Sequence, residues 1–252
     1  MSQLQKRIQR LQRRDGPGIG FGRVSREQPR AMALIATGND AAALAAAIEA
    51  EADAIIVEAA TAAEAARLME GTASEKVSVG ALLPSLSEAD AEALRGAKCD
   101  FVVSPLDTTD SAAVDTEKTG QVVMASLDME DNTLRALAPL GLDGLFVKRS
   151  GGRMTLGQQL ALVRLASFAS TGLLVTVAAD ASVGELRVLR DSGAVAVVAP
   201  AGASADALRA LSDSLKAVPA PKRGRREGAE IAIVPAAAGA GEEHEHDDDE
   251  DD

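Results

Sequence analysis

The sequence predicts a (β/α)8 barrel, and three observations lead to that fold class. Eight short apolar runs recur between residues 31 and 199, at intervals of about 20 to 29 residues. The runs are continuous and lack in-out alternation, as expected of parallel strands that are covered on both faces. A helical segment follows each run, and eight strand-helix units of this length close most naturally into a barrel.

The predicted strands are rich in Ala, Val, Ile and Leu. In chain order they cover residues 31–37, 53–59, 77–84, 100–105, 121–128, 144–148, 173–178 and 194–199. An open doubly wound sheet is the alternative, and it would carry a glycine-rich turn after its first strand. That turn reads ATGNDAAA here, with a single glycine, which favours the barrel.

The segments between the strands carry helix start and stop signals. The start signals are Asn39 or Asp40, the capping boxes Thr61-x-x-Glu64 and Ser182-x-x-Glu185, a similar Ser87-x-x-Asp90, and Asn132 or Thr133. Glycines 71, 96, 141 and 193 stand where helices should stop. The last helix of the barrel is predicted over residues 203–218.

We therefore divide the chain into three parts, of which the first is a basic N-terminal helix and connector over residues 1–30. Leu4, Ile8 and Leu11 form one apolar stripe of a short amphipathic helix, among basic side chains. This helix could cover the bottom of the barrel, pair with another chain or touch an anionic surface. The barrel follows over residues 31–218.

The third part, residues 219–252, is a basic linker followed by a low-complexity acidic tail. Residues 242–252 read EEHEHDDDEDD, a composition typical of a disordered segment. His244 and His246 alternate there with glutamates, and such a run lacks the fixed geometry of a metal site. We expect the charged termini to make contacts with other proteins.

Composition excludes several classes of protein. The chain carries a net charge of −12 and only 2% aromatic residues, without Trp or Tyr, which argues against nucleic-acid binding by base stacking. Its single cysteine, Cys99, fits a reducing compartment and a small buried side chain. No apolar segment approaches the length of a membrane span. These features predict a soluble, cytoplasmic protein.

In a barrel of this kind, function belongs to residues at the carboxyl ends of the strands and in the loops behind them. These positions hold Thr37, Glu58, Ser104 with Asp107, Asp128, Lys148, Thr176 and Asp180. Partial burial would lower the pKa of a lysine such as Lys148 and free its amine to attack a carbonyl. Glu58, with Asp100 or Asp128, could then move protons.

Two plainer interpretations of Lys148 stay open: an ion pair with Glu58 at the mouth of the barrel, or a side chain that reaches solvent. Magnesium held by Glu58, Asp107 and Asp128 is a further alternative, since that ion needs few protein carboxylates.

The segment DGLFVKRSGG, with the helix and strands that follow it, resembles the second half of the class I aldolase barrels, most closely deoxyribose-phosphate aldolase. The resemblance implies that Lys148 corresponds to the lysine of strand six that forms a Schiff base. It also implies a proton-transfer role for Asp100 in CDFVVSP. A related resemblance, to the keto-deoxy-phosphogluconate aldolases, pairs Glu58 with Lys148.

The sequence also departs from that family. Thr176 stands where a second lysine is expected, and Ala179-Asp180 replaces two phosphate-binding glycines. Asp180 has the wrong charge for receiving a phosphate.

Two functions therefore remain. The first is a divergent, non-catalytic barrel that binds a small carbonyl or anionic metabolite, or acts as a scaffold, with Asp128, Thr176 and Asp180 as binding residues. The second is a Schiff-base lyase that uses Lys148, with Glu58 or Asp100 as acid/base. Neither requires a bound cofactor or metal.

Overall fold

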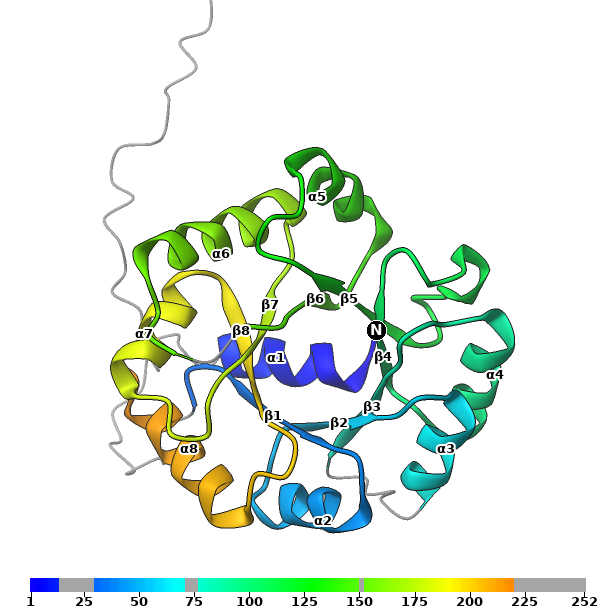
Figure 1. The fold of residues 1–252 in the computed structure, drawn as a ribbon, viewed down its shortest axis with the longest axis horizontal. Coiled ribbons are helices and arrows are strands. Elements are labelled where there is room, and N and C mark those ends of the chain that lie inside the picture. The colour runs from blue at the N-terminus through cyan, green and yellow to red at the C-terminus, as the bar shows by residue number, and fades with distance from the viewer. Residues whose placement is uncertain (14–29, 71–76, 150–151, 220–252) are drawn as a thin grey trace, which may run out of the picture. The chain divides into compact units, whose positions relative to one another are not determined.

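The computed structural model describes residues 1–13, 30–70, 77–149 and 152–219. Eight parallel strands form a closed barrel, in which each strand pairs with the next and β1 pairs with β8 (Figure 1). The strands are β1 (Ala33–Gly38), β2 (Ala54–Glu58), β3 (Ser78–Leu82), β4 (Phe101–Pro105), β5 (Gly120–Ala125), β6 (Gly144–Val147), β7 (Leu173–Thr176) and β8 (Ala194–Ala199). The predicted (β/α)8 barrel is confirmed, because the pairing of β1 with β8 leaves no sheet edge.

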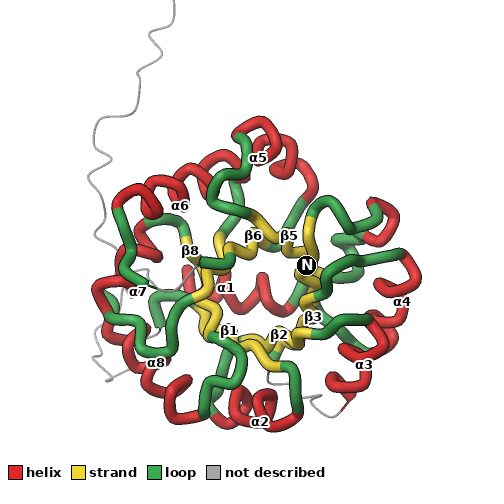
Figure 2. The backbone as a smooth tube through the Cα atoms, in the orientation of Figure 1, coloured by secondary structure: helices red, strands yellow, loops and turns green. Residues whose placement is uncertain are grey.

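Seven of the described helices surround the strands, and α1 crosses the centre of the ring (Figure 2). The helices are α1 (Gln3–Arg13), α2 (Ala41–Glu49), α3 (Ala62–Glu70), α4 (Glu88–Gly96), α5 (Asp131–Leu137), α6 (Leu156–Ala169), α7 (Val183–Asp191) and α8 (Ala205–Ala217). Two short 3-10 turns are η1 (Ser111–Ala113) and η2 (Ala138–Leu140).

The start signals in the sequence locate most of these helices. The Asp40 carboxylate accepts a hydrogen bond from the Ala43 N–H, and Ser87 forms a complete capping box with Asp90. The start of α5 differs from the prediction. Its N-cap is Glu130, whose side chain makes no capping hydrogen bond, and not Asn132 or Thr133.

The interior of the barrel is packed with inward-facing side chains from alternate positions of each strand. Phe101 and Phe146 are its largest strand side chains, and they lie in one cluster with Ile35, Ile56 and Leu174. The next inward positions, two residues further along β1, β2, β6 and β7, belong to Thr37, Glu58, Lys148 and Thr176. The inward alternation therefore brings polar side chains to the carboxyl ends of the strands, above an apolar interior.

Helix α1 closes the opposite end of the barrel. Its Leu4 and Ile8 are buried in the same interior cluster as Phe101. The Asp100 carboxylate accepts hydrogen bonds from the backbone N–H groups of Gln3 (2.8 Å) and Leu4 (2.9 Å). Of the three roles considered for this helix, the structure shows the first, in which the helix covers the bottom of the barrel.

Within the part of the chain that the structure describes, no helix has the length and apolar character needed to cross a membrane. The predicted acidic tail, with His244 and His246, lies outside the described residues.

Candidate functional site

A cavity of about 500 Å³ opens at the carboxyl ends of the strands. Its floor and much of its wall are apolar, and include Leu82, Met124, Phe146 and Val198. Its polar lining residues are Thr37, Glu58, Lys148, Arg149, Thr176 and Glu185. An apolar cavity with a few convergent polar groups is the usual form of a small-molecule site.

Glu58, the last residue of β2, and Lys148, which directly follows β6, both line this cavity. Glu58 is half-buried, whereas Lys148 is exposed, so the partial burial expected for the lysine is not observed. Their charged groups do not form an ion pair, and no hydrogen bond ties the Lys148 ammonium to another described residue. Both groups are therefore free to interact with a ligand.

Thr176 is anchored to the residue that follows Lys148. Its Oγ1 accepts a hydrogen bond of 2.7 Å from the Arg149 backbone N–H and donates one of 3.3 Å to the Arg149 carbonyl oxygen. These two contacts fix the end of β6 against β7, and so hold the backbone from which Lys148 projects. The hydroxyl of Thr37 is likewise committed, since it donates to the carbonyl oxygen of Ala199 at 2.9 Å.

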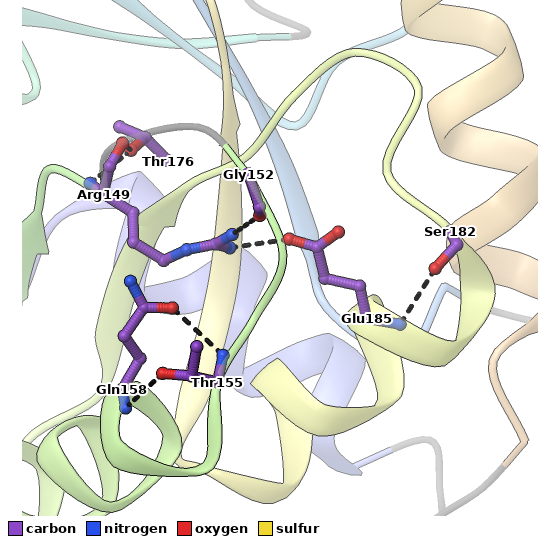
Figure 3. Close-up of polar contacts among 7 residues, drawn as sticks. All are labelled: Arg149, Gly152, Thr155, Gln158, Thr176, Ser182 and Glu185. Carbon is purple, nitrogen blue, oxygen red and sulfur yellow. Dashed lines mark hydrogen bonds and ion pairs between the residues drawn. The ribbon is translucent and has the colours of Figure 1, made fainter.

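The sequence analysis missed Arg149, whose side chain is only 3% exposed. Its guanidinium donates to the Glu185 carboxylate (2.7 Å) and to the Gly152 carbonyl oxygen (2.8 Å), as Figure 3 shows. The Ser182 hydroxyl accepts from the Glu185 N–H, but the Glu185 side chain turns to Arg149 and leaves half of the predicted capping box unmade. No pattern in the sequence distinguishes this arginine from a solvent-exposed one.

Asp100 does not lie at this site. It directly precedes β4, so it stands at the amino end of the barrel, where it binds α1 and accepts a 2.5 Å hydrogen bond from Ser78. The catalytic role expected for Asp100 requires its side chain to lie at the carboxyl end of β4, where the cavity is. We therefore correct that assignment and leave Asp100 out of the proposed chemistry.

Asp128 and Asp180 do not line the cavity either, and both are exposed in loops that follow strands. The Ser126 hydroxyl beside Asp128, as the largest cause, keeps the pKa of that carboxyl below its usual value. Nor do Glu58, Asp107 and Asp128 gather, because among the described residues no three acidic, histidine or cysteine side chains form a metal-binding cluster. The expectations of a magnesium site and of Asp128 as a cavity residue are not met.

Cys99 offers no nucleophile to this site. It is buried before β4, and burial is the largest cause that raises the pKa of its thiol to about 12. A thiol in that state stays protonated at neutral pH, which agrees with the expected small buried side chain.

This chain is similar to known proteins in its fold. The sequence matches no protein-family model and no curated protein. Among solved structures, tryptophan synthase of Mycobacterium tuberculosis has a TM-score of 0.62 at 14% identity, over 86% of this chain and 98% of that chain. Orotidine 5'-phosphate decarboxylase of Pyrococcus horikoshii has 0.54 at 15%, over 72% and 99%. KGPDC of Streptococcus mutans has 0.58 at 15%, over 75% and 99%.

The fold is an aldolase-type TIM barrel. At these identities the similarity concerns the fold alone, since this barrel serves many unrelated reactions. The narrower resemblance to deoxyribose-phosphate aldolase is not confirmed by these comparisons.

Proposed function

We propose that this barrel binds a small carbonyl or anionic metabolite in the cavity at the carboxyl ends of its strands. One observation carries the proposal: Lys148 and Glu58 line one largely apolar cavity, and neither is neutralised by the other. The ammonium suits a carbonyl or carboxylate oxygen, and the carboxylate suits a hydroxyl or amine of the same ligand.

The same observation supports a second candidate, a Schiff-base lyase. The deprotonated Lys148 amine would attack the carbonyl carbon of a substrate, and loss of water from the carbinolamine would give the imine. Glu58, which lines the same cavity, would take up and return protons. Against this candidate stand Thr176 at the expected position of a second lysine, and Asp100 at the other end of the barrel.

Calorimetry and borohydride trapping together separate the two candidates. The protein is titrated and, separately, reduced with a panel of small aldehydes and 2-oxo acids, and adducts are located by peptide mass spectrometry. Heat of binding that Lys148→Met abolishes, without an adduct, supports a binding protein. An adduct at Lys148 whose yield falls about 100-fold in Glu58→Gln supports the lyase, because general acid-base catalysis is worth about that factor. The absence of both heat and adduct with every compound contradicts both candidates.

A further inference from the structure

An apolar stripe lies on the outer surface of helix α6, which stands between α5 and α7 on the outside of the ring (Figure 1). Leu156 is 70% exposed, Leu160 is 62% exposed and Val163 is 39% exposed. These residues are four and then three positions apart, so their side chains share one face of the helix. Among the described residues, no part of the chain covers this face.

The opposite face of α6 is apolar as well, and it packs on the barrel through its buried residues Leu162, Leu165 and Ala169. A helix that is apolar on all sides is normally buried on all sides. Helix α8 shows the usual pattern of an outer helix, because it turns charged side chains to solvent: Asp206, Arg209, Asp213 and Lys216. The outer face of α6 therefore has the composition of a covered surface.

A groove of about 310 Å³ lies beside this stripe, between the N-terminal halves of α6 and α7. Leu156 borders the groove, and Met154 and Val188 supply its other large apolar side chains. An apolar ridge and an apolar hollow thus lie next to each other on the same face. Such a face is complementary to itself, because a two-fold axis can place the ridge of one copy in the hollow of another.

The charges on this face also favour a second copy of the chain. Residues 154–163 hold no charged side chain. The charged residues that border the groove are Arg153, which is exposed, and Glu185, whose carboxylate is paired with Arg149. The unbalanced charge at the groove is therefore positive, and it is attracted to a second chain of net charge −12. A basic partner would find no acidic cluster here.

We propose that this face of α6, with the adjoining groove, joins two copies of the chain in a symmetric dimer. With the two-fold axis along α6, Leu160 at the middle of the stripe meets its own copy, and Leu156 of each copy enters the groove of the other. The centre of the contact is then apolar and free of charge, as the core of an interface usually is. A stable interface buries about 800 Å² on each partner, so the neighbouring surfaces of α5 and α7 belong to it as well.

The oligomeric state of the full chain tests this proposal by sedimentation over a series of concentrations. We expect the wild type to be a dimer, and Leu160→Glu to raise its dissociation constant at least about 100-fold, because two carboxylates would be buried without partners. Ile48→Glu is the matched control. Ile48 is 37% exposed on α2, which is separated from α6 by α7 and α8 around the ring, so the dimer should persist. Urea denaturation establishes that both variants fold.

A cysteine at the same position gives a second measurement that does not depend on disrupting the interface. The native Cys99 is buried, so it should not compete for the oxidant. Two copies of Leu160→Cys that meet at the two-fold axis are close enough for a disulfide. Mild oxidation should therefore link Leu160→Cys into a covalent dimer, in a yield at least about tenfold above that of Ile48→Cys.

A wild-type chain that stays monomeric up to about 0.1 mM overturns the proposal. Equal dissociation by Leu160→Glu and Ile48→Glu, or equal cross-linking of the two cysteine variants, overturns it as well. In a monomer, the rate at which Leu160→Cys reacts with a thiol reagent shows what replaces the second copy. Fast reaction indicates an open face that is available to a different protein, and slow reaction indicates that another segment of the chain covers it. None of these results depends on the ligand proposed for the cavity.

Discussion

Arg149 and Glu185 join the loop after β6 to the first turn of α7 through an ion pair of 2.7 Å at the wall of the cavity. Glu185 is 20% exposed, and the buried Arg149 Nε has no hydrogen-bond partner. The pair thus holds two neighbouring loops of the candidate site in one arrangement, next to the backbone that carries Lys148.

Replacing Arg149 should destabilise the protein. Arg149→Met removes the partner of a largely buried carboxylate, and the free energy of unfolding should fall by about 2–4 kcal/mol. Urea denaturation measures the change. Arg209→Met is the control, because Arg209 pairs with Glu49 and Asp206 in solvent and should cost less than about 1 kcal/mol. Equal losses in the two variants would contradict the role given to the buried pair.

Removing the Asp100 carboxylate should release helix α1. Asp100→Ala deletes the acceptor for the N–H groups of Gln3 and Leu4, and should cost about 1–2 kcal/mol, as loss of a helix cap does. Hydrogen exchange at those two amides should accelerate at least about tenfold, since 1.4 kcal/mol is a factor of ten. Asp40→Ala, which removes the cap of α2, should lower stability similarly while exchange in α1 stays slow. Borohydride labelling of Lys148 should not change in either variant.

The contribution of Asp143 to the free energy of unfolding should fall as the pH rises. Burial is the largest cause that raises the pKa of this carboxyl above its usual 3.8, with nearby Asp100 adding to it, while the Ser2 hydroxyl and the N-terminal amino group oppose it. The folded state then holds the proton more tightly than the unfolded state. The stabilisation that the protonated carboxyl contributes is complete below about pH 3.8, and it is lost as the pH rises through the raised pKa of the folded state.

The comparison with Asp143→Asn isolates this group from the other carboxyls. The variant stays neutral, so its stability relative to the wild type should increase as the pH is raised from about 3.8 through the raised pKa. Urea denaturation at a series of pH values measures the difference. A difference that is constant with pH, or that shrinks as the pH rises, would contradict the assignment.

Gly80 in β3 should not tolerate a side chain. A Cβ atom there would lie 2.5 Å from the ring of Phe101, which is fully buried in the barrel. Gly80→Ala should therefore lower the free energy of unfolding by about 1–3 kcal/mol, the usual cost of overpacking a core. Gly96→Ala is the matched control, because nothing lies within 4 Å of its added Cβ and it ends α4. That change should be neutral or stabilising by up to about 1 kcal/mol.

Much of the fold was predictable because strands and helices of a barrel are local patterns. All eight predicted apolar runs became strands, with bounds that shifted by a few residues. The start signal at Ser87 worked because a cap depends on residues three apart in the sequence. The predicted start of α5 was wrong. Glu130 is the N-cap of that helix, and its side chain makes no capping hydrogen bond, so the sequence carries no start signal there.

Part of the site was predictable for the same reason. Lys148, Glu58 and Thr176 follow apolar strands, and strand alternation alone directs them to the carboxyl end of the barrel. Asp100 was placed wrongly, because a resemblance in sequence did not distinguish the residue before a strand from one at its far end. Arg149 was missed, since its burial depends on Glu185, 36 residues away in the chain.

Periodicity along single strands and helices was enough to predict the closed barrel and the end of the barrel at which Lys148 and Glu58 lie. The three-dimensional packing was needed to show that α1 fills the opposite end, that Asp100 binds the backbone of that helix, and that Arg149 and Glu185 neutralise each other. These are contacts between residues distant in the chain, whose partners are chosen by packing and desolvation and leave no repeating pattern in the sequence.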